Sequence, residues 1–137
     1  MAPALRLVVV ALAALILLPR PLAALDGARQ LLSQCETIDR GAAGSGREVE
    51  IPATREALLC WGYLEAFQDL AALSDPSGNR LLGACPPEDG TLLDLVRAFV
   101  TYGRARGSEL PENSAVAVIR ALQQAYPCPA SKQPPKR

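Results

Sequence analysis

Apolar residues recur at helical spacing in four stretches of the chain, separated by segments rich in Gly, Pro, Ser and Asp. In the first stretch, Leu31, Leu32, Cys35 and Ile38 share one helical face, and Asp26 is a candidate N-cap. This spacing predicts a first helix over about residues 27–38.

The second stretch has the strongest apolar pattern, and it predicts a helix from Arg55 to Leu73 with Thr54 as its N-cap. Two adjacent apolar stripes run along it, one of Leu59, Tyr63, Ala66, Leu70 and Leu73 and the other of Cys60, Leu64, Phe67 and Ala71. Together they predict a wide buried face, as expected for the central helix of a bundle. Gly62 lies inside this helix at a cost of about 1 kcal/mol relative to Ala, which favours close approach of another backbone.

Two further helices are predicted in the C-terminal half. Thr91 and Asp94 have the spacing of a capping box, so the third helix should begin near Leu92, and Gly103 and Gly107 bracket its end. The fourth should begin at Pro111 and stop before residues 127–129 (PCP). The residues expected to face inward are Leu92, Leu95, Val96, Phe99 and Val100 in the third helix and Val116, Ile119, Leu122 and Tyr126 in the fourth.

The connecting segments carry turn and linker signals. Gly41–Gly46 is a flexible Gly-rich link, and Ser74–Asn79 is a turn cluster. Residues 47–51 alternate charged and apolar side chains, so a short strand is possible, although no partner strand is recognisable. The sequence therefore predicts an all-α fold, a small bundle of about four to five helices.

The two ends of the chain differ from its middle. Residues 1–24 have the pattern of a secretory signal peptide, with Arg6 ahead of the apolar run Leu7–Leu18 and small residues at 22–24 (LAA). An uncleaved anchor is the alternative, but the apolar run is shorter than the roughly 20 residues that span a bilayer. Residues 130–137 are basic, Pro-rich and expected to be disordered. We expect one exported, periplasmic all-α domain over residues 25–129, with no stable membrane anchor after signal cleavage.

Charge and composition exclude several function classes. The 14 basic residues balance the 14 acidic ones, and few residues are aromatic, so a nucleic-acid partner is not expected. The chain has no His, which removes Ser/His and Cys/His catalysis. Glu65 and Asp69 could form a carboxylate pair, but they lie opposite the apolar face and fit a solvated surface better. We therefore expect no enzyme activity, no catalytic residues, no cofactor and no metal.

The four cysteines, Cys35, Cys60, Cys85 and Cys128, all follow the predicted signal peptide. An even number in a small exported domain predicts two disulfides, and no two cysteines have the close spacing of a zinc site. Three pairings are possible. Antiparallel packing of consecutive helices favours Cys35 with Cys60 and Cys85 with Cys128.

Four motifs in order resemble one known family. They are LLxxC (31–35), CxGYLxAFxD (60–69), CPPxxxTLxxLVRxFVxY (85–102) and AVxVIxALxxAYPCP (115–129). This pattern is similar to the resistance-associated protein and type VI amidase immunity family, of the Rap and Tai kind. The resemblance implies a periplasmic, disulfide-bonded helical protein, often a homodimer, that binds a peptidoglycan amidase delivered by type VI secretion and occludes its active site.

The motif residues are mostly core and disulfide positions, so they do not identify the surface that would bind the toxin. Loops on a rigid scaffold usually carry recognition. The candidate contacts are therefore Ser74, Asp75, Ser77, Gly78 and Asn79 in one link, and Arg104, Arg106 and Glu109 in another. The alternative functions are an acid-activated periplasmic chaperone of the HdeA kind and an orphan envelope protein. The sequence names neither the toxin nor the oligomeric state.

Overall fold

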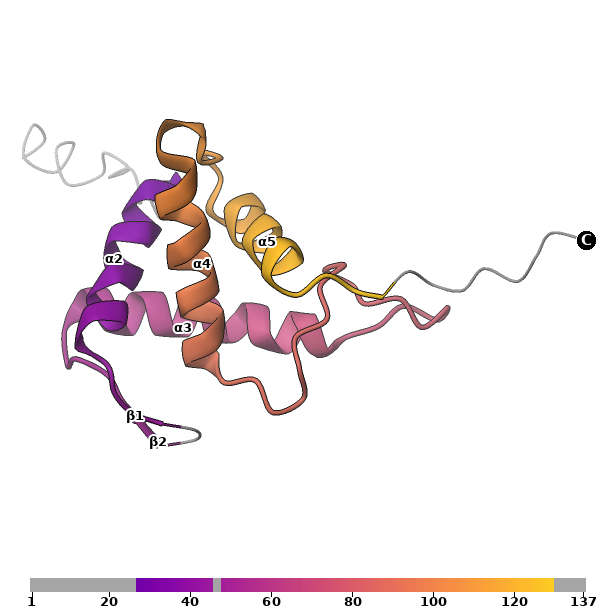
Figure 1. Ribbon diagram of the computed structural model, residues 1–137, viewed down its shortest axis with the longest axis horizontal. Helices are drawn as coiled ribbons and strands as arrows, with labels where there is room; N and C mark the ends of the chain where they lie inside the picture. Colours follow the sequence, from indigo (N-terminus) through magenta and orange to yellow (C-terminus); the bar gives the residue numbers. More distant parts are fainter. Residues whose placement is uncertain (1–26, 46–47, 130–137) are drawn as a thin grey trace, which may run out of the picture.

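The computed structural model of the chain describes residues 27–45 and 48–129. The predicted signal peptide, the candidate cap Asp26 and the Pro-rich tail at 130–137 lie outside these ranges. The described residues form four α-helices, α2 (Gly27–Gly41), α3 (Arg55–Ala72), α4 (Leu92–Arg106) and α5 (Ser114–Ala125), and one 3-10 turn, η1 (Gly107–Glu109). The predicted small all-α bundle is confirmed (Figure 1).

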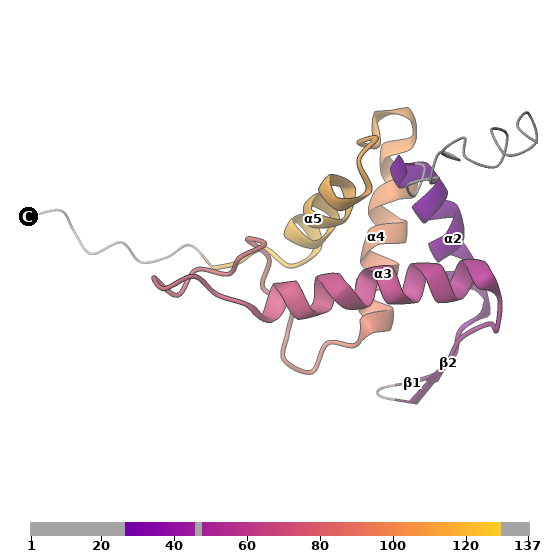
Figure 2. The ribbon, with the colours of Figure 1, turned by 180° about the vertical axis from the view of Figure 1, so that it is seen from behind.

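The four helices form one bundle, in which α3 runs across the other three. α2 and α4 lie side by side, α5 packs against α4, and α3 crosses the others at a steep angle (Figures 1 and 2). The largest side chains in the core come from all four helices, and Phe99, Leu31, Leu64 and Leu122 are almost fully buried. Among the described residues, no helix is long and apolar enough to cross a membrane.

The predicted helix starts are confirmed in two cases and shifted in a third. The Thr54 hydroxyl accepts a hydrogen bond from the Ala57 N–H at 3.2 Å and caps α3. Thr91 and Asp94 form the predicted capping box of α4. The fourth helix begins at Ser114, three residues later than the prediction, because the side chain of Asn113 provides its cap.

The Gly-rich link contains the partner strand that could not be recognised in the sequence. Strand β1 (Ala43–Ser45) pairs antiparallel with β2 (Glu48–Glu50), with Gly44 opposite Val49. Gly44 has φ of +98°, and a Cβ there would lie 2.3 Å from the Glu48 carbonyl oxygen. The glycine signal therefore marked a close backbone approach within a small hairpin, and the expectation of a flexible link was wrong.

The expectation of a wide buried face on α3 was also wrong. The stripe containing Cys60, Leu64, Phe67 and Ala71 is buried, whereas the adjacent stripe is largely exposed. Leu59 is 39% exposed, Leu70 37% and Leu73 52%. Within residues 27–45 and 48–129, α2, α4 and α5 contact α3 from one side, and no described helix covers the second stripe. Val116 on α5, also expected to face inward, is 40% exposed.

The close approach predicted at Gly62 occurs instead at Gly103. A Cβ at Gly62 would meet nothing within 4 Å, whereas a Cβ at Gly103 would lie 2.7 Å from Cδ1 of Leu32. Gly103 is buried, and α4 continues past it to Arg106. The glycine expected to mark a frayed helix end is therefore the contact point of α2 with α4.

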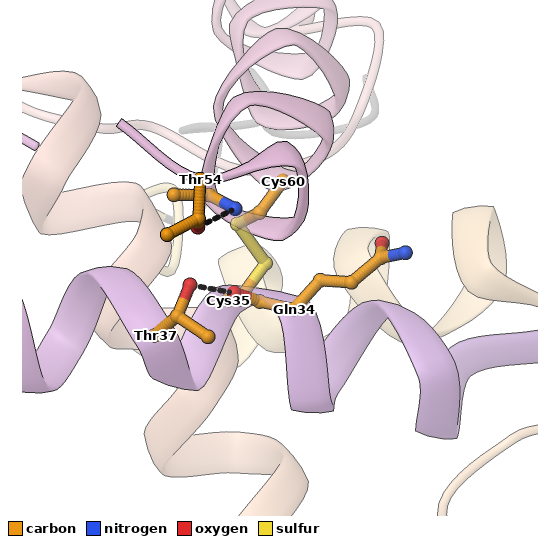
Figure 3. The surroundings of a disulfide bond; sticks show 6 residues. Gln34, Cys35, Thr37, Thr54 and Cys60 are labelled. Carbon is orange, nitrogen blue, oxygen red and sulfur yellow. Dashed lines mark hydrogen bonds between the residues drawn. A yellow bond between two sulfur atoms is a disulfide. The ribbon is translucent and has the colours of Figure 1, made fainter. Parts of the chain in front are cut away.

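Two disulfides join the elements, and both predicted pairings are confirmed. Cys35 and Cys60 link α2 to α3, with their Cα atoms 5.1 Å apart (Figure 3). Cys85 and Cys128, whose Cα atoms are 4.9 Å apart, link the segment before α4 to the segment after α5. Neither bond would form in a reducing compartment, so the pairings fit an exported protein.

Candidate functional site

A hairpin at residues 73–82 connects α3 to the segment that leads into α4. Its two arms are joined by an antiparallel bridge between Ser74 and Arg80, and the Leu81 N–H donates to the Leu73 carbonyl at 3.0 Å. Both ribbon views show this 73–82 hairpin projecting beyond the end of α3, away from the helical body (Figures 1 and 2). The β1–β2 hairpin also projects from the helical body in both views.

The side chain of Asp75 organises the turn of this hairpin. One carboxylate oxygen, Oδ1, accepts from the backbone N–H groups of Ser77 at 2.8 Å and Asn79 at 2.9 Å. The other, Oδ2, accepts from the Asn79 side-chain amide at 3.0 Å. Asp75, Pro76 and Gly78 occupy the first, second and fourth positions of a type I turn signature, and Gly78 has φ of +83°. The turn is thus fixed by its own hydrogen bonds.

These hydrogen bonds also determine the charge of the turn. The Asn79 side-chain amide, followed by the backbone N–H groups, lowers the pKa of Asp75 below its ordinary value. Asp75 therefore stays ionised at neutral pH and well into the acid range, and the hydrogen bonds that shape the turn persist with it.

The base of the hairpin is attached to two helices. The Arg80 guanidinium donates to the Ala72 carbonyl at 2.7 Å, which satisfies one of the unpaired carbonyls at the end of α3. On the other arm, the Gln123 side chain on α5 donates to the Leu82 carbonyl at 2.8 Å, and Leu82 itself is buried. A projecting tip on such a fixed base is a preorganised binding element.

The structure gathers the first group of predicted contact residues on this element. Ser74, Asp75, Ser77, Gly78 and Asn79 all lie on the 73–82 hairpin, and all are exposed. The hydrogen bonds of Ser77 in the turn use its backbone N–H, so its side chain is not needed to hold the fold.

The second group of predicted contacts lies elsewhere, at the C-terminal end of α4 and in η1, away from the hairpin in both views. The Arg104 guanidinium forms ion pairs with Glu36 at 3.0 Å and Asp39 at 2.9 Å on α2. Arg106 lies over the Tyr102 ring, 5.1 Å from its centroid, while Glu109 is exposed in η1. The two arginines thus make contacts within the chain, and the structure does not bring the two groups together.

Acidic and metal-ligating side chains are spread over the described surface. The described residues contain no group of three or more His, Cys, Asp or Glu side chains placed to hold a metal ion. Glu65 and Asp69 are both exposed on α3, as expected for a solvated surface.

The uncovered stripe on α3 is a second surface feature, and sequence reasoning assigned it to the core. This α3 stripe consists of Leu59, Tyr63, Ala66, Leu70 and Leu73, whose spacing alternates between four and three residues. The same spacing lines the seam of helix pairs that pack against each other.

Comparison with known proteins identifies one family. The sequence model of the Rap1a immunity proteins matches residues 27–128, which include every described helix and all four cysteines. No curated protein and no solved structure matches the chain.

Proposed function

Because this chain belongs to the family of Rap1a immunity proteins, we propose that it protects its producer by binding and inhibiting a peptidoglycan amidase toxin delivered by type VI secretion. Such a protein acts as a stoichiometric inhibitor and needs no catalytic residues of its own. The mechanism proposed is occlusion of the active-site cleft of the toxin.

The observation that carries this mechanism is the 73–82 hairpin. An enzyme cleft is concave, and a projecting, internally hydrogen-bonded turn has the complementary shape. Because Asp75 already fixes the turn, little conformational entropy is lost on binding. Leu81 on the second arm is 57% exposed and supplies apolar surface that would become buried at the rim of the cleft.

The proposed location is the periplasm, where peptidoglycan lies. Residues 1–24 carry the pattern of a signal peptide, and two disulfides fit an oxidising compartment. The proposed boundaries are a signal peptide at 1–24, a folded domain at 25–129 and a basic tail at 130–137.

The first experiment is to sequence the DNA that flanks the gene and to purify the secreted amidase encoded there. The expected result is a 1:1 complex of the two proteins that abolishes peptidoglycan cleavage. Replacing Ser77 by Arg at the hairpin tip should weaken binding about 100-fold, as for a residue at the centre of an interface. Binding without inhibition would overturn the occlusion mechanism.

The matched control is Ser108→Arg in η1, which places the same side chain on the other candidate link. Ser108 is also exposed, and its backbone carbonyl, not its side chain, accepts a hydrogen bond from the Arg29 guanidinium at 3.4 Å. We expect this variant to bind the amidase as tightly as the unaltered protein. The opposite result, with Ser108→Arg defective and Ser77→Arg normal, would move the binding surface to the α4–α5 link.

A homodimer is the second proposed assembly, and the α3 stripe supports it. An antiparallel pair of α3 helices related by a two-fold axis would place Leu59 opposite Leu73 of the second copy, Leu70 opposite Gly62, and Ala66 on the axis. Gly62 beside Ala66 has open space around it, which permits two backbones to approach closely. The residues of this surface would then be buried between the two copies.

Light scattering of two charge variants tests the dimer. Leu70→Glu places a charge in the α3 stripe and should give monomers. Leu58→Glu is the control, because Leu58 is 60% exposed on the same helix but lies outside the stripe. This control should remain dimeric, and a monomeric unaltered protein would exclude the proposed assembly.

The family match favours immunity over the alternative of an acid-activated chaperone. A chaperone would bind a hydrophobic dye and hold unfolded clients at about pH 2, where its carboxylates are neutral. Immunity requires neither property, so the dye assay separates the two functions.

A further inference from the structure

The two disulfides of this protein differ in their exposure to solvent. Cys35 and Cys60 are completely buried between α2 and α3 in the helical core (Figure 3). Cys85 and Cys128 are only partly buried and lie at the edge of the molecule. An open groove of about 530 Å³ runs beside them, lined by Gly78, Asn79, Arg80, Gly83, Cys85, Cys128 and Pro129. A small thiol reagent can therefore reach the second disulfide without unfolding the core.

The second disulfide, Cys85–Cys128, cross-links two segments that lie next to the hairpin. It ties the returning arm of the 73–82 hairpin to the segment that follows α5. Around it, Ala84 forms an antiparallel bridge with Pro127, and the Cys85 N–H donates to the Tyr126 carbonyl at 2.8 Å. Leu82 and Ala84 are buried in this arm, and the disulfide adds a covalent link to their packing and to these hydrogen bonds.

We propose that the Cys85–Cys128 disulfide is a reducible clamp that holds the 73–82 hairpin in its binding position, so that the protein is competent to bind its toxin only when this bond is oxidised. This inference rests on the proposed function of the hairpin. It assigns a separate role to each disulfide, since Cys35–Cys60 holds α2 on α3 and does not touch the hairpin.

The redox step is thiol–disulfide exchange with a dithiol. A dithiol thiolate attacks one sulfur of the Cys85–Cys128 bond, forms a mixed disulfide and releases the other cysteine as a thiolate. The second thiol of the reagent then displaces the remaining cysteine and closes its own disulfide. Two electrons pass from the dithiol to the protein, and the two cysteines take up two protons.

In this proposal, the redox state of the compartment controls whether the protein can bind its toxin. In a reducing compartment the bond is open, and the hairpin is held by hydrogen bonds and by the packing of Leu82 and Ala84. After export to an oxidising compartment the bond closes and fixes the hairpin. The protein would thus become an inhibitor at the place where the toxin acts.

The test begins with the oxidised protein and graded amounts of dithiothreitol, followed by alkylation and peptide mass spectrometry. Cys85 and Cys128 should become alkylated at a reductant concentration at least about tenfold lower than Cys35 and Cys60. At that concentration the far-UV circular dichroism should be unchanged, while a protease should begin to cut within residues 73–90. Simultaneous reduction of both bonds, or an uncut hairpin with Cys85 and Cys128 fully alkylated, would overturn the proposal.

The second arm of the test measures binding to the amidase encoded beside the gene. Reduction of Cys85–Cys128 should weaken binding at least about tenfold, which is about 1.4 kcal/mol. The variant with Cys85→Ser and Cys128→Ser should bind equally weakly and be insensitive to reductant. If this variant binds the amidase with unchanged affinity, the clamp proposal is overturned, even if a protease cuts its hairpin.

The two arms keep the two proposals distinguishable. If the oxidised protein does not bind the amidase at all, the proposed function fails. Alkylation and proteolysis need no toxin and still decide whether the second disulfide is opened first and whether it holds the hairpin.

Discussion

The side chain of Leu32 on α2 packs directly against the backbone of Gly103 on α4. A Cβ at Gly103 would lie 2.7 Å from Leu32 Cδ1 and 2.9 Å from Cδ2, closer than side-chain carbons can approach. The absence of a side chain at residue 103 is therefore what sets the spacing of these two helices.

Substitution of this glycine should destabilise the protein despite the better helix propensity of Ala. We expect Gly103→Ala to lower the free energy of unfolding by about 1 kcal/mol, as for overpacking of a core. Both substitutions are made in the Leu70→Glu background, in which no second copy should pack on α3. Gly62→Ala is then the matched control, because residue 62 is helical, exposed and without near neighbours, and it should raise the free energy of unfolding by about 0.5–1 kcal/mol. Urea denaturation measures both. Equal effects at the two positions would contradict the packing role of Gly103.

The capping box of α4 should make stability depend on pH in the acid range. Hydrogen bonds from the Thr91 side chain and then its backbone lower the pKa of Asp94. A carboxyl whose pKa is lowered in the folded state stabilises that state above its unfolded pKa of about 3.9 and loses the contribution as the pH falls through the folded value.

We therefore expect Asp94→Asn to lower the free energy of unfolding at pH 7 by about 1 kcal/mol or less, the usual contribution of a helix cap. The difference from the unaltered protein should disappear only as the pH falls through the lowered pKa of Asp94, where the carboxyl becomes protonated. Thermal unfolding at a series of pH values tests this prediction. A difference that persists at the lowest pH would show that the cap acts by packing and not by charge.

The turn of the 73–82 hairpin should depend on the Asp75 carboxylate. Asp75→Ala removes the acceptor of three hydrogen bonds and should loosen the turn while the helices remain folded. Amide hydrogen exchange should therefore rise at Ser77 and Asn79 and stay unchanged in α4. Protection that remains at both amides would show that the arms, and not Asp75, fix the turn.

Because the pKa of Asp75 is lowered, the turn should also persist as the pH falls to the ordinary Asp value and open only below it. The turn opens at low pH because only the ionised carboxylate of Asp75 accepts all of these hydrogen bonds, and protonation weakens them. Hydrogen exchange at the same two amides, followed from neutral to acid pH, measures the midpoint.

The buried disulfide should contribute to global stability. Replacing Cys35 and Cys60 by Ala should lower the free energy of unfolding by roughly 3.5 kcal/mol, as loop-closure entropy predicts for a closed loop of this length. The comparison variant carries the same replacements at Cys85 and Cys128. A negligible loss without Cys35–Cys60 would mean that packing of α2 on α3 needs no covalent link.

The helices and disulfides could be predicted from the sequence because their signals are local. Thr54 and the Thr91–Asp94 pair fixed two helix starts. The observed cysteine pairs were favoured by the expectation that consecutive helices pack as antiparallel pairs; α2 and α3 do contact each other, but α3 crosses α2 at a steep angle. The start of α5 was misplaced because Pro111 and Asn113 both suit a helix terminus, and only the side-chain cap of Asn113 decides between them.

What could not be predicted depends on neighbours distant in the sequence. Gly62 and Gly103 have the same chemistry, and only the position of Leu32 shows which of them is the contact point. The apolar pattern of α3 likewise shows that two faces can be buried, but it does not show that this chain covers only one. For the candidate site, the turn signature placed the hairpin residues correctly, whereas the projection of the hairpin from the body follows from how α3 crosses the bundle.

In the 73–82 hairpin, the residues that hold the turn are different from the residue at its tip. This separation affects how binding specificity can change. Asp75, Gly78 and Asn79 hold the turn, while the exposed side chain of Ser77 makes none of the hydrogen bonds that hold it. If the hairpin binds the toxin as proposed, replacements of Ser77 should leave the scaffold intact and alter only what it recognises. A chain built in this way can follow a changing toxin by single substitutions at one position, with no loss of folding stability to compensate elsewhere.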